Sequence, residues 1–295
     1  MSLYISTTFS SDNSEIQPIL NKLQERKIRF IEIGSTHIKN SSSRLKLYNN
    51  TKYIIHNYFP PRKKNFVLNI ASEDEIIREN SINFIKNSIN FCKKFHISHY
   101  TIHPGFLSEA KVETKKKGLR NFDLSFEPKY VSKKQRAKIL EKTIKTIDYL
   151  YKIAKENKVH LMIENQGSKT SNSFVLFDTF EEIIKLKQAI GNKFLLNFNL
   201  AHALLANENL NRRVTFLKFY ELADYFEVSE ISKNLDSHLP ITLNGGKVSQ
   251  IFKKYRKLFA KKNLILEYRN IDFDTLLKSY HQIQGLLYPL SPKIK

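Results

Sequence analysis

Histidine and glutamate side chains stand where short apolar runs of this sequence end. "YTIHPGF" places His103 directly before a Pro-Gly turn, and "YIIHNYF" places His56 at a similar junction. Glu164 ends the apolar run of "HLMIENQG", and Glu267 ends that of "LILEYRN". Imidazole nitrogens and carboxylate oxygens are ligands for Zn²⁺, Mn²⁺, Fe²⁺ or Co²⁺, and both groups also exchange protons. One such residue alone is more often structural, so their chemistry depends on whether the fold brings them together.

Further polar side chains follow other apolar runs. Asn199 lies three residues before His202 in "NFNLAHALLAN", and Glu227 lies within "YFEVSE". Asp236 and His238 in "NLDSHLPI" are two residues apart, so an extended backbone points both side chains the same way. Burying several carboxylates and imidazoles together is costly unless a cation or a proton compensates the charge. Gathered in one place, these residues predict a divalent metal site, with Zn²⁺ or Mn²⁺ as the expected ion.

Apolar runs of strand length alternate with longer helical patterns along the whole chain. Continuous apolar strands predict a sheet that is buried on both faces, and alternation with helices predicts parallel βαβ units. Eight units in about 250 residues favour an α/β fold, a (β/α)₈ TIM barrel, over a doubly wound open sheet. The predicted strands are 3–6, 30–34, 53–57, 99–103, 160–165, 194–199, 225–230 and 264–268.

A barrel would bring the polar residues together, because its active site forms at the carboxyl ends of the strands. We expect residues 1–295 to form a single TIM-barrel domain. Residues 107–132 follow the fourth predicted strand as a long insertion, and long insertions at that end commonly cover or shape a site.

Two amphipathic segments are the clearest helices. In 72–95, apolar residues recur at near-helical spacing, and Ser72 with Glu75 three residues later resembles a capping box. In 133–158, Ile139, Ile147 and Ala154 belong to one apolar stripe. We expect both stripes to pack on the sheet.

The chain carries 49 Lys and Arg against 28 Asp and Glu, a formal net charge of +21. This excess favours anionic partners, although lysines spread over solvated helix faces would give the same total. Lys63 and Lys64 follow the third predicted strand, so we expect them near the barrel mouth, where they would suit an anionic small-molecule carbohydrate. Nucleic acid is the alternative partner.

Composition excludes several other classes of protein. Cys92 is the only cysteine, so an internal disulfide is impossible. The N-terminus has no basic segment before an apolar core, and no apolar run is long enough to cross a bilayer, so we expect a cytoplasmic protein without a membrane partner. No glycine-rich phosphate loop follows the first strand, so we expect no nucleotide cofactor.

From about residue 28 to 270 the sequence resembles the xylose-isomerase-like TIM barrels. This superfamily includes sugar-phosphate isomerases and epimerases and the zinc-dependent apurinic endonucleases (AP endonuclease family 2). The resemblance rests on an ordered series of motifs at strand ends. In chain order they are "IIHNYFPP", "NFVLNIAS", "TIHPGF", "LMIENQG", "NFNLAHAL", "DSHLPI" and "LILEYR".

The resemblance implies two metal-binding groups and a pair of catalytic residues. One metal group is His56, His103, Glu164 and Glu267, and the group used by three-metal members is His202, Asp236 and His238. In family members, the glutamates matching Glu164 and Glu267 also exchange the substrate proton. Arg269, just past Glu267, is then a candidate for binding a phosphate or a hydroxyl.

Two positions depart from the family pattern. Asn199 stands where an aspartate is usual, and Glu227 stands where a histidine is usual, with Ser229 as the alternative register. Both residues still offer oxygen ligands. Asn199 lacks a charge, so we expect a cation there to be held more weakly.

The resemblance leaves three functions open. The first is a metal-dependent sugar or sugar-phosphate isomerase/epimerase, in which the metal stabilises an enediolate while the glutamates transfer a proton. The second is an apurinic endonuclease-like phosphodiesterase, but this chain reads "NFNLAH" and "DSH" where the endonucleases carry L-D-T-C-H-like and D-R-H motifs. The third is a degenerate barrel that binds a ligand without turnover.

Overall fold

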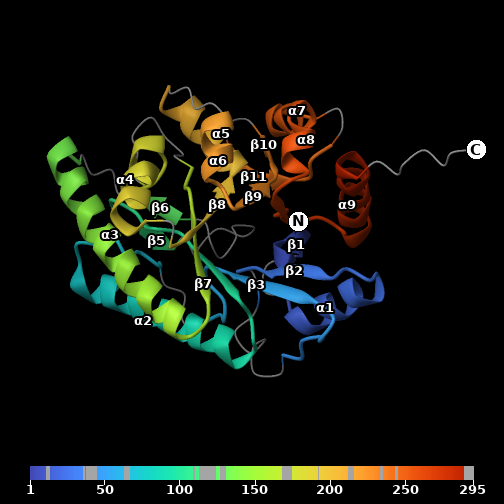
Figure 1. The fold of residues 1–295 in the computed structure, drawn as a ribbon, viewed down its shortest axis with the longest axis horizontal. Helices are drawn as coiled ribbons and strands as arrows, with labels where there is room; N and C mark the ends of the chain where they lie inside the picture. Colours follow the sequence, from blue (N-terminus) through green and yellow to red (C-terminus); the bar gives the residue numbers. More distant parts are fainter. Residues whose placement is uncertain are drawn as a thin grey trace, which may run out of the picture.

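Eight parallel strands close into a barrel. Figure 1 shows these strands at the centre of the molecule. The computed structural model describes residues 1–10, 14–35, 37, 45–62, 67–108, 110–112, 124–126, 131–167, 175–191, 193–211, 216–232, 235–242 and 245–288. Around the barrel the strand order is β1-β12-β9-β8-β7-β4-β3-β2. The strands are β1 (Leu3–Ser6), β2 (Phe30–Ile33), β3 (Lys52–His56), β4 (His99–Ile102), β7 (His160–Glu164), β8 (Leu195–Asn199), β9 (Tyr225–Val228) and β12 (Asn263–Leu266).

The (β/α)₈ fold class predicted from the sequence is confirmed. The first and last barrel strands pair in parallel, with Leu3 opposite Leu264, and this pairing closes the ring. A doubly wound open sheet ends in two unpaired edge strands, whereas every strand of this ring has two neighbours, so that alternative is wrong. Each predicted strand matches an observed one to within a few residues at either end.

Helices surround the strands on the outside of the barrel (Figure 1). A short 3-10 helix, η1 (Thr7–Phe9), directly follows β1. The α-helices are α1 (Ile16–Glu25), α2 (Glu75–Lys94), α3 (Lys133–Glu156), α4 (Phe180–Ile190), α5 (Leu200–Asn209), α6 (Phe216–Leu222), α7 (Lys247–Lys254), α8 (Arg256–Phe259) and α9 (Phe273–Leu287). Among the described residues, none of the helices combines the length and the apolar character needed to span a membrane.

The N-terminus of α2 differs from the expected capping box. The helix begins at Glu75, and its N-cap is Asp74, whose carboxylate accepts hydrogen bonds from the backbone N–H groups of Ile76 and Ile77. Ser72 lies one step earlier, where its hydroxyl accepts a hydrogen bond from Asp74 N. A carboxylate in the first turn also interacts favourably with the helix dipole, so Asp74 is the better cap.

Two small antiparallel hairpins accompany the barrel. β5 (Ala110–Val112) pairs with β6 (Leu124–Phe126) within the predicted insertion 107–132, and α3 begins at the residue that follows this insertion. β10 (Glu230–Ser232) pairs with β11 (Leu235–Leu239) directly after β9. Asp236 and His238 therefore lie on a strand, where sequence alone suggested an extended loop.

The barrel interior changes from apolar to polar toward the carboxyl ends of the strands. The layer nearer the amino ends of the strands, which we call the lower layer, is an apolar cluster. It consists of Tyr4, Ile54, Met162, Tyr225 and Ile265, with Phe30 and Leu195 packed against them. Successive strand residues alternate between faces, so the residue two positions later also points inward. Two positions after each residue of this apolar cluster, in the order just given, stand Ser6, His56, Glu164, Glu227, Glu267, Glu32 and Asn197. We call this second set the polar layer.

Candidate metal centre

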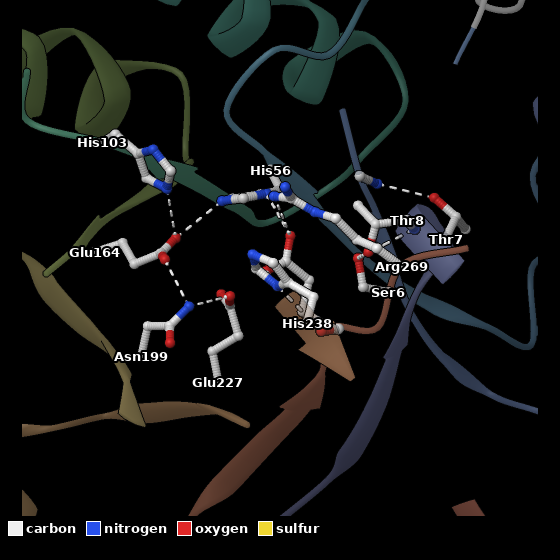
Figure 2. A network of polar contacts seen from close by, with 12 residues as sticks. Ser6, Thr7, Thr8, His56, His103, Glu164, Asn199, Glu227, His238 and Arg269 are labelled. Atoms are coloured by element: carbon white, nitrogen blue, oxygen red, sulfur yellow. Dashed lines mark hydrogen bonds and ion pairs between the residues drawn. The ribbon is translucent and has the colours of Figure 1, made fainter. Parts of the chain in front are cut away.

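Glu164 lies at the centre of the polar network in Figure 2. It ends β7, and its side chain is fully buried. One carboxylate oxygen, Oε2, is 2.9 Å from His56 Nε2 and 3.0 Å from His103 Nε2, while Oε1 accepts a hydrogen bond of 3.1 Å from Asn199 Nδ2. Strands β3, β4 and β8 thus direct their carboxyl ends at one carboxylate. His56, His103 and Glu164 form the first candidate cation-binding group.

His202, Asp236 and His238 form a second candidate group. Asp236 Oδ2 is 3.3 Å from His202 Nε2, and Asp236 Oδ1 is 3.0 Å from His238 Nε2. Asp236 and His238 are two residues apart on β11, and their side chains face each other. His202 joins the two groups, because its Nδ1 lies 3.2 Å from Glu164 Oε1.

Glu227, His238 and Glu267 form a third group that shares His238 with the second. His238 Nδ1 is 2.8 Å from Glu267 Oε2, and Arg269 Nη2 is 3.6 Å from Glu267 Oε1. His238 has a φ of 47°, in the left-handed region that non-glycine residues rarely adopt. Such strain is common where a site requires one side-chain direction.

Asn199 and Glu227, the two departures from the family pattern, contact each other directly. Asn199 Nδ2 donates to Glu227 Oε1 at 2.6 Å as well as to Glu164, and Asn197 Nδ2 donates to Glu227 Oε2 at 2.9 Å. The Asn199 side-chain oxygen caps α5 by accepting from His202 N. The amide nitrogen of Asn199 therefore faces the glutamates, while its oxygen supports the helix. Glu227 is in register with Asn199 across β8 and β9, whereas Ser229 lies beyond the end of β9.

The charges in the site compensate one another only in part. Burial would raise the pKa of Glu164, but His103, His202 and His56 outweigh it and hold that pKa well below its usual range. The pKa of Glu227 is shifted in the opposite direction. Burial, together with repulsion from Glu164 and Glu267, raises the pKa of Glu227 well above its usual value. The site therefore holds more buried carboxylate than its histidines can neutralise.

Unsatisfied donor and acceptor atoms test whether a divalent cation fits. Asp236 Oδ1 and His238 Nε2 lie 3.0 Å apart but form no well-directed hydrogen bond, and Glu267 Oε1 is buried without one; all three atoms belong to the candidate groups. Within each group the ligand atoms lie within 4.8 Å of one another. Buried polar atoms normally find partners, and a cation would supply one here. Mixed imidazole and carboxylate ligands fit a divalent metal.

Most of the residues singled out from the sequence converge on this centre. The two exceptions are Lys63 and Lys64, the predicted substrate-binding lysines, which lie outside the described residues. Sequence reasoning missed Glu32 and Asn197 in the polar layer. Each is a polar residue at an inward position of a largely apolar strand, and that signal was present in "FIEIG" and "FLLNFN".

Two curated proteins share weak similarity with most of the chain. One is an uncharacterized protein of Methanocaldococcus jannaschii, 23% identical over 276 residues, which cover 92% of this chain and 94% of that protein. The other is a probable endonuclease 4 of Aquifex aeolicus, 23% identical over 204 residues, 68% of this chain and 63% of that protein.

Solved structures share the fold at lower identity. A D-tagatose 3-epimerase-like protein has a TM-score of 0.67 at 18% identity, covering 97% of both chains. D-psicose 3-epimerase with D-tagatose, from Clostridium cellulolyticum H10, has a TM-score of 0.65 at 11% identity, covering 97% of this chain and 98% of that one. The IolI protein with a zinc atom has a TM-score of 0.67 at 11% identity, covering 98% of this chain and 100% of that one.

The match to a family profile covers most of the chain. Residues 23–283 match the profile described as xylose isomerase-like TIM barrel. The matched region contains seven of the eight barrel strands and every candidate ligand described above. The closed parallel barrel and the profile agree: the chain belongs to the xylose isomerase-like TIM barrel family.

Proposed function

We propose that this protein is a metal-dependent isomerase or epimerase that acts on a small carbohydrate by moving a proton between neighbouring carbons. The observation that carries this proposal is the placement of His56 between two buried carboxylates. Its Nε2 is 2.9 Å from Glu164 Oε2, and its Nδ1 is 3.9 Å from Glu267 Oε1. The carboxylates come from β7 and β12, which β8 and β9 separate in the sheet, so they face the space at the mouth from different sides.

Two of the proposed ligands also carry the proton. His56, His103, Glu164 and Glu267 would hold one divalent ion, Zn²⁺ or Mn²⁺, and His202, Asp236 and His238 would offer a further position. When bound, such an ion polarises a carbonyl and an adjacent hydroxyl of the substrate. Glu164 and Glu267 transfer the proton, one removing it and the other returning it. Arg269 orients a phosphate or a hydroxyl at the mouth, and Lys63 and Lys64 add attraction for an anionic sugar.

Exchange of solvent deuterium into the substrate tests this function. The protein, loaded with Zn²⁺ or Mn²⁺, is incubated in D₂O with D-tagatose, D-psicose and their phosphate esters, because epimerases of the first two sugars share the fold. We expect one substrate to gain deuterium next to its carbonyl. Glu164→Gln and Glu267→Gln should each slow exchange about 10²–10⁴-fold, the usual contribution of a general acid or base.

Glu141→Gln is the matched control, because Glu141 lies exposed on α3, away from the mouth. This variant should exchange deuterium at the wild-type rate. Lack of exchange across a broad panel of ketoses and sugar phosphates would refute the proposed reaction. Full activity in both Glu164→Gln and Glu267→Gln would refute the proposed proton carriers.

A second candidate function is cleavage of DNA at abasic sites. Three candidate cation-binding groups adjoin one another, the net charge is +21, and a probable endonuclease 4 is among the similar proteins. The "NFNLAH" and "DSH" motifs count against it. An incision assay on an abasic duplex with the Zn²⁺- or Mn²⁺-loaded protein tests this function. The absence of strand incision would refute it.

Metal analysis separates both enzymes from a barrel that binds a ligand without turnover. Glu227 and Asn199 motivate this third possibility. A catalytic centre should retain at least about one equivalent of divalent metal after purification, as structured His and carboxylate sites do. Substoichiometric metal, combined with no exchange and no incision, would favour the non-catalytic barrel.

A further inference from the structure

Glu32 is a buried carboxylate that belongs to none of the three candidate cation-binding groups. It lies on β2 in the polar layer, its side chain is 0% exposed, and its two oxygens are buried without a well-directed hydrogen bond, with the Ser6 hydroxyl nearby. Its neighbours Ile31 and Ile33 pack in the large core cluster on the other face of the strand. Burying a carboxylate without a well-directed hydrogen bond is costly, so its retention inside the barrel requires a reason.

The two ring nitrogens of His56 have different surroundings. Nε2 faces Glu164 and the candidate cation position, whereas Nδ1 is buried without a hydrogen bond. Glu267 Oε1 is 3.9 Å from Nδ1, which is beyond hydrogen-bond distance. A histidine that binds a cation through Nε2 carries its proton on Nδ1, and a buried N–H requires an acceptor. The site therefore needs an acceptor behind His56.

Electrostatic attraction couples Glu32 to His56. Burial opposes protonation of His56, but attraction first to Glu32 and then to Glu164 outweighs it and raises the pKa of His56 to about 9. Burial raises the pKa of Glu32 to about 7, and attraction to His56 is the strongest opposing influence. Both side chains point inward from adjacent strands, β2 and β3.

Two other described side chains compete for the role of acceptor. Glu267 Oε1 is 3.9 Å from Nδ1, but Glu267 is already a candidate cation ligand. Thr101 lies opposite His56 in the register of β3 and β4, and its hydroxyl is also buried without a partner. A hydroxyl carries no charge, however, and charge-assisted hydrogen bonds are about twice as strong as neutral ones. Thr101 therefore provides a control at the same depth in the barrel.

We propose that Glu32 is a positioning residue: its carboxylate accepts the hydrogen bond of His56 Nδ1–H, directly or through one buried water, and fixes the ring with Nε2 toward the cation. This role rests on the proposed metal-dependent function. A carboxylate behind a ligating histidine sets the ring orientation and raises the basicity of the ligating nitrogen. Glu32 touches neither cation nor substrate, and it acts only through His56.

Metal affinity provides the first test. Zn²⁺ binding to the full chain, stripped of metal, is measured by competition with a chromophoric chelator for wild type, Glu32→Gln and Thr101→Val. Loss of a carboxylate behind a ligating histidine should weaken binding by about 10–100-fold, while Thr101→Val stays within about threefold of wild type. Wild-type affinity in Glu32→Gln, or an equal loss in Thr101→Val, would overturn the proposal.

The His56 ring proton provides a second test that does not depend on metal. Long-range ¹H–¹⁵N correlation spectra locate the His56 Nδ1–H resonance, with His56→Asn used for its assignment. We expect a low-field, hydrogen-bonded proton in wild type that moves upfield in Glu32→Gln and stays unchanged in Thr101→Val. The same spectra report whether each variant is folded, and Glu32→Asp, which keeps the charge, should restore part of the shift.

The two tests separate this proposal from the proposed function. If the wild-type protein binds no divalent metal, the metal-dependent function fails, while the metal-free spectra still decide whether Glu32 holds His56. A His56 Nδ1–H resonance that is identical in wild type and Glu32→Gln contradicts the role of Glu32, whatever the protein catalyses.

Discussion

At the scale of single residues, the site arises because the next inward-facing residue of a strand lies two positions after an inward apolar one. Met162 and Ile265 belong to the apolar lower layer, and Glu164 and Glu267 follow two positions later. The apolar residues fill the barrel, and the polar residues face its mouth. Because each strand repeats this spacing, side chains far apart in sequence reach one height in the barrel.

Asn199 and Glu227 show that two departures from a pattern can compensate each other. An aspartate with a histidine carries one carboxylate, and so does an asparagine with a glutamate. Here the carboxylate stands on β9 and accepts hydrogen bonds from amides on β8. The pair therefore keeps one acidic group next to Glu164 while moving it to the neighbouring strand.

Asn199→Asp tests this compensation. The substitution removes the N–H donors to Glu164 and Glu227 and places a third carboxylate beside them, so we expect the metal-free protein to lose on the order of 3 kcal/mol of stability. Zn²⁺ should restore more stability to Asn199→Asp than to wild type, because the added charge attracts the cation. Urea unfolding with chelator and with Zn²⁺ measures both effects.

Glu227→Gln in the Asn199→Asp background is the matched control, since it removes the added repulsion. The double variant should recover part of the lost stability in chelator. An Asn199→Asp protein as stable as wild type without metal would show that the Asn199 amide does not hold the two glutamates in place.

At the scale of elements, helix caps and hydrogen bonds between loops fix the positions of the side chains that follow the strands. Asn199 is both a member of the site and the N-cap of α5, so the start of that helix and the position of His202 are set together. Thr7 connects the segments that follow β1 and β2. Its hydroxyl oxygen accepts a hydrogen bond from Gly34 N and lies 2.7 Å from His37 Nε2.

Asp74→Ala tests the start of α2. The Asp74 carboxylate accepts from two orphan N–H groups, so its loss should cost about 1 kcal/mol of unfolding free energy, as is usual for an N-cap. Glu75→Gln, one residue later on the exposed surface, should change stability by less than about 0.5 kcal/mol. Equal effects of the two substitutions in urea unfolding would contradict the assignment of Asp74 as the cap.

His37 makes stability depend on pH. Burial lowers the pKa of His37 from 6.5 to about 4, and its neutral ring lies between Thr7 and the Ser14 carbonyl. Between these two pKa values the unfolded chain binds a proton that the folded protein does not. His37 therefore contributes its full stability above pH 6.5 and loses it as the pH falls toward 4, by about 1–2 kcal/mol between pH 7 and pH 5.

Urea unfolding at pH 7 and pH 5 measures the contribution of His37. His37→Gln should be less stable than wild type at pH 7, because two buried contacts are weakened, but it should lose less stability on going to pH 5. The same substitution at the exposed His281 of α9 should leave the wild-type pH dependence intact. A His37→Gln curve parallel to that of wild type would contradict this role.

At the scale of the whole molecule, the site depends on closure of the ring. Candidate ligands come from strands on all sides of the barrel, and the pairing of β1 with β12 joins the two ends of the sheet. We infer that the chain unfolds as one domain, because the unfolding of any one strand would open the ring. The insertion 107–132 contributes the β5–β6 hairpin outside the ring.

Metal should therefore stabilise the molecule as a unit. Zn²⁺ at about 100 times its dissociation constant should raise the unfolding free energy by about 2.7 kcal/mol, and a chelator should remove that gain. Calorimetry should show one transition that moves as a whole with metal concentration. Two transitions, of which only one responds to Zn²⁺, would contradict the single-domain inference.

The sequence by itself determined the architecture and most of the centre. Continuous apolar strands alternating with amphipathic helices predict a closed parallel barrel, and that fold sends every strand end to one face. His103 and Glu164 could thus be placed together although 61 residues separate them. The strand pattern depends on local spacing and burial, which a single chain displays directly.

Only the tertiary structure decided how these side chains meet. It shows the Asn199 amide nitrogen facing two glutamates, His202 bridging two groups, and Glu32 buried in the polar layer without a well-directed hydrogen bond. It also shows that the N-cap of α2 is Asp74, where the sequence pattern indicated Ser72. These features depend on rotamers and on contacts between strands, and their free energies arise from burial and neighbouring charge, which linear spacing does not contain.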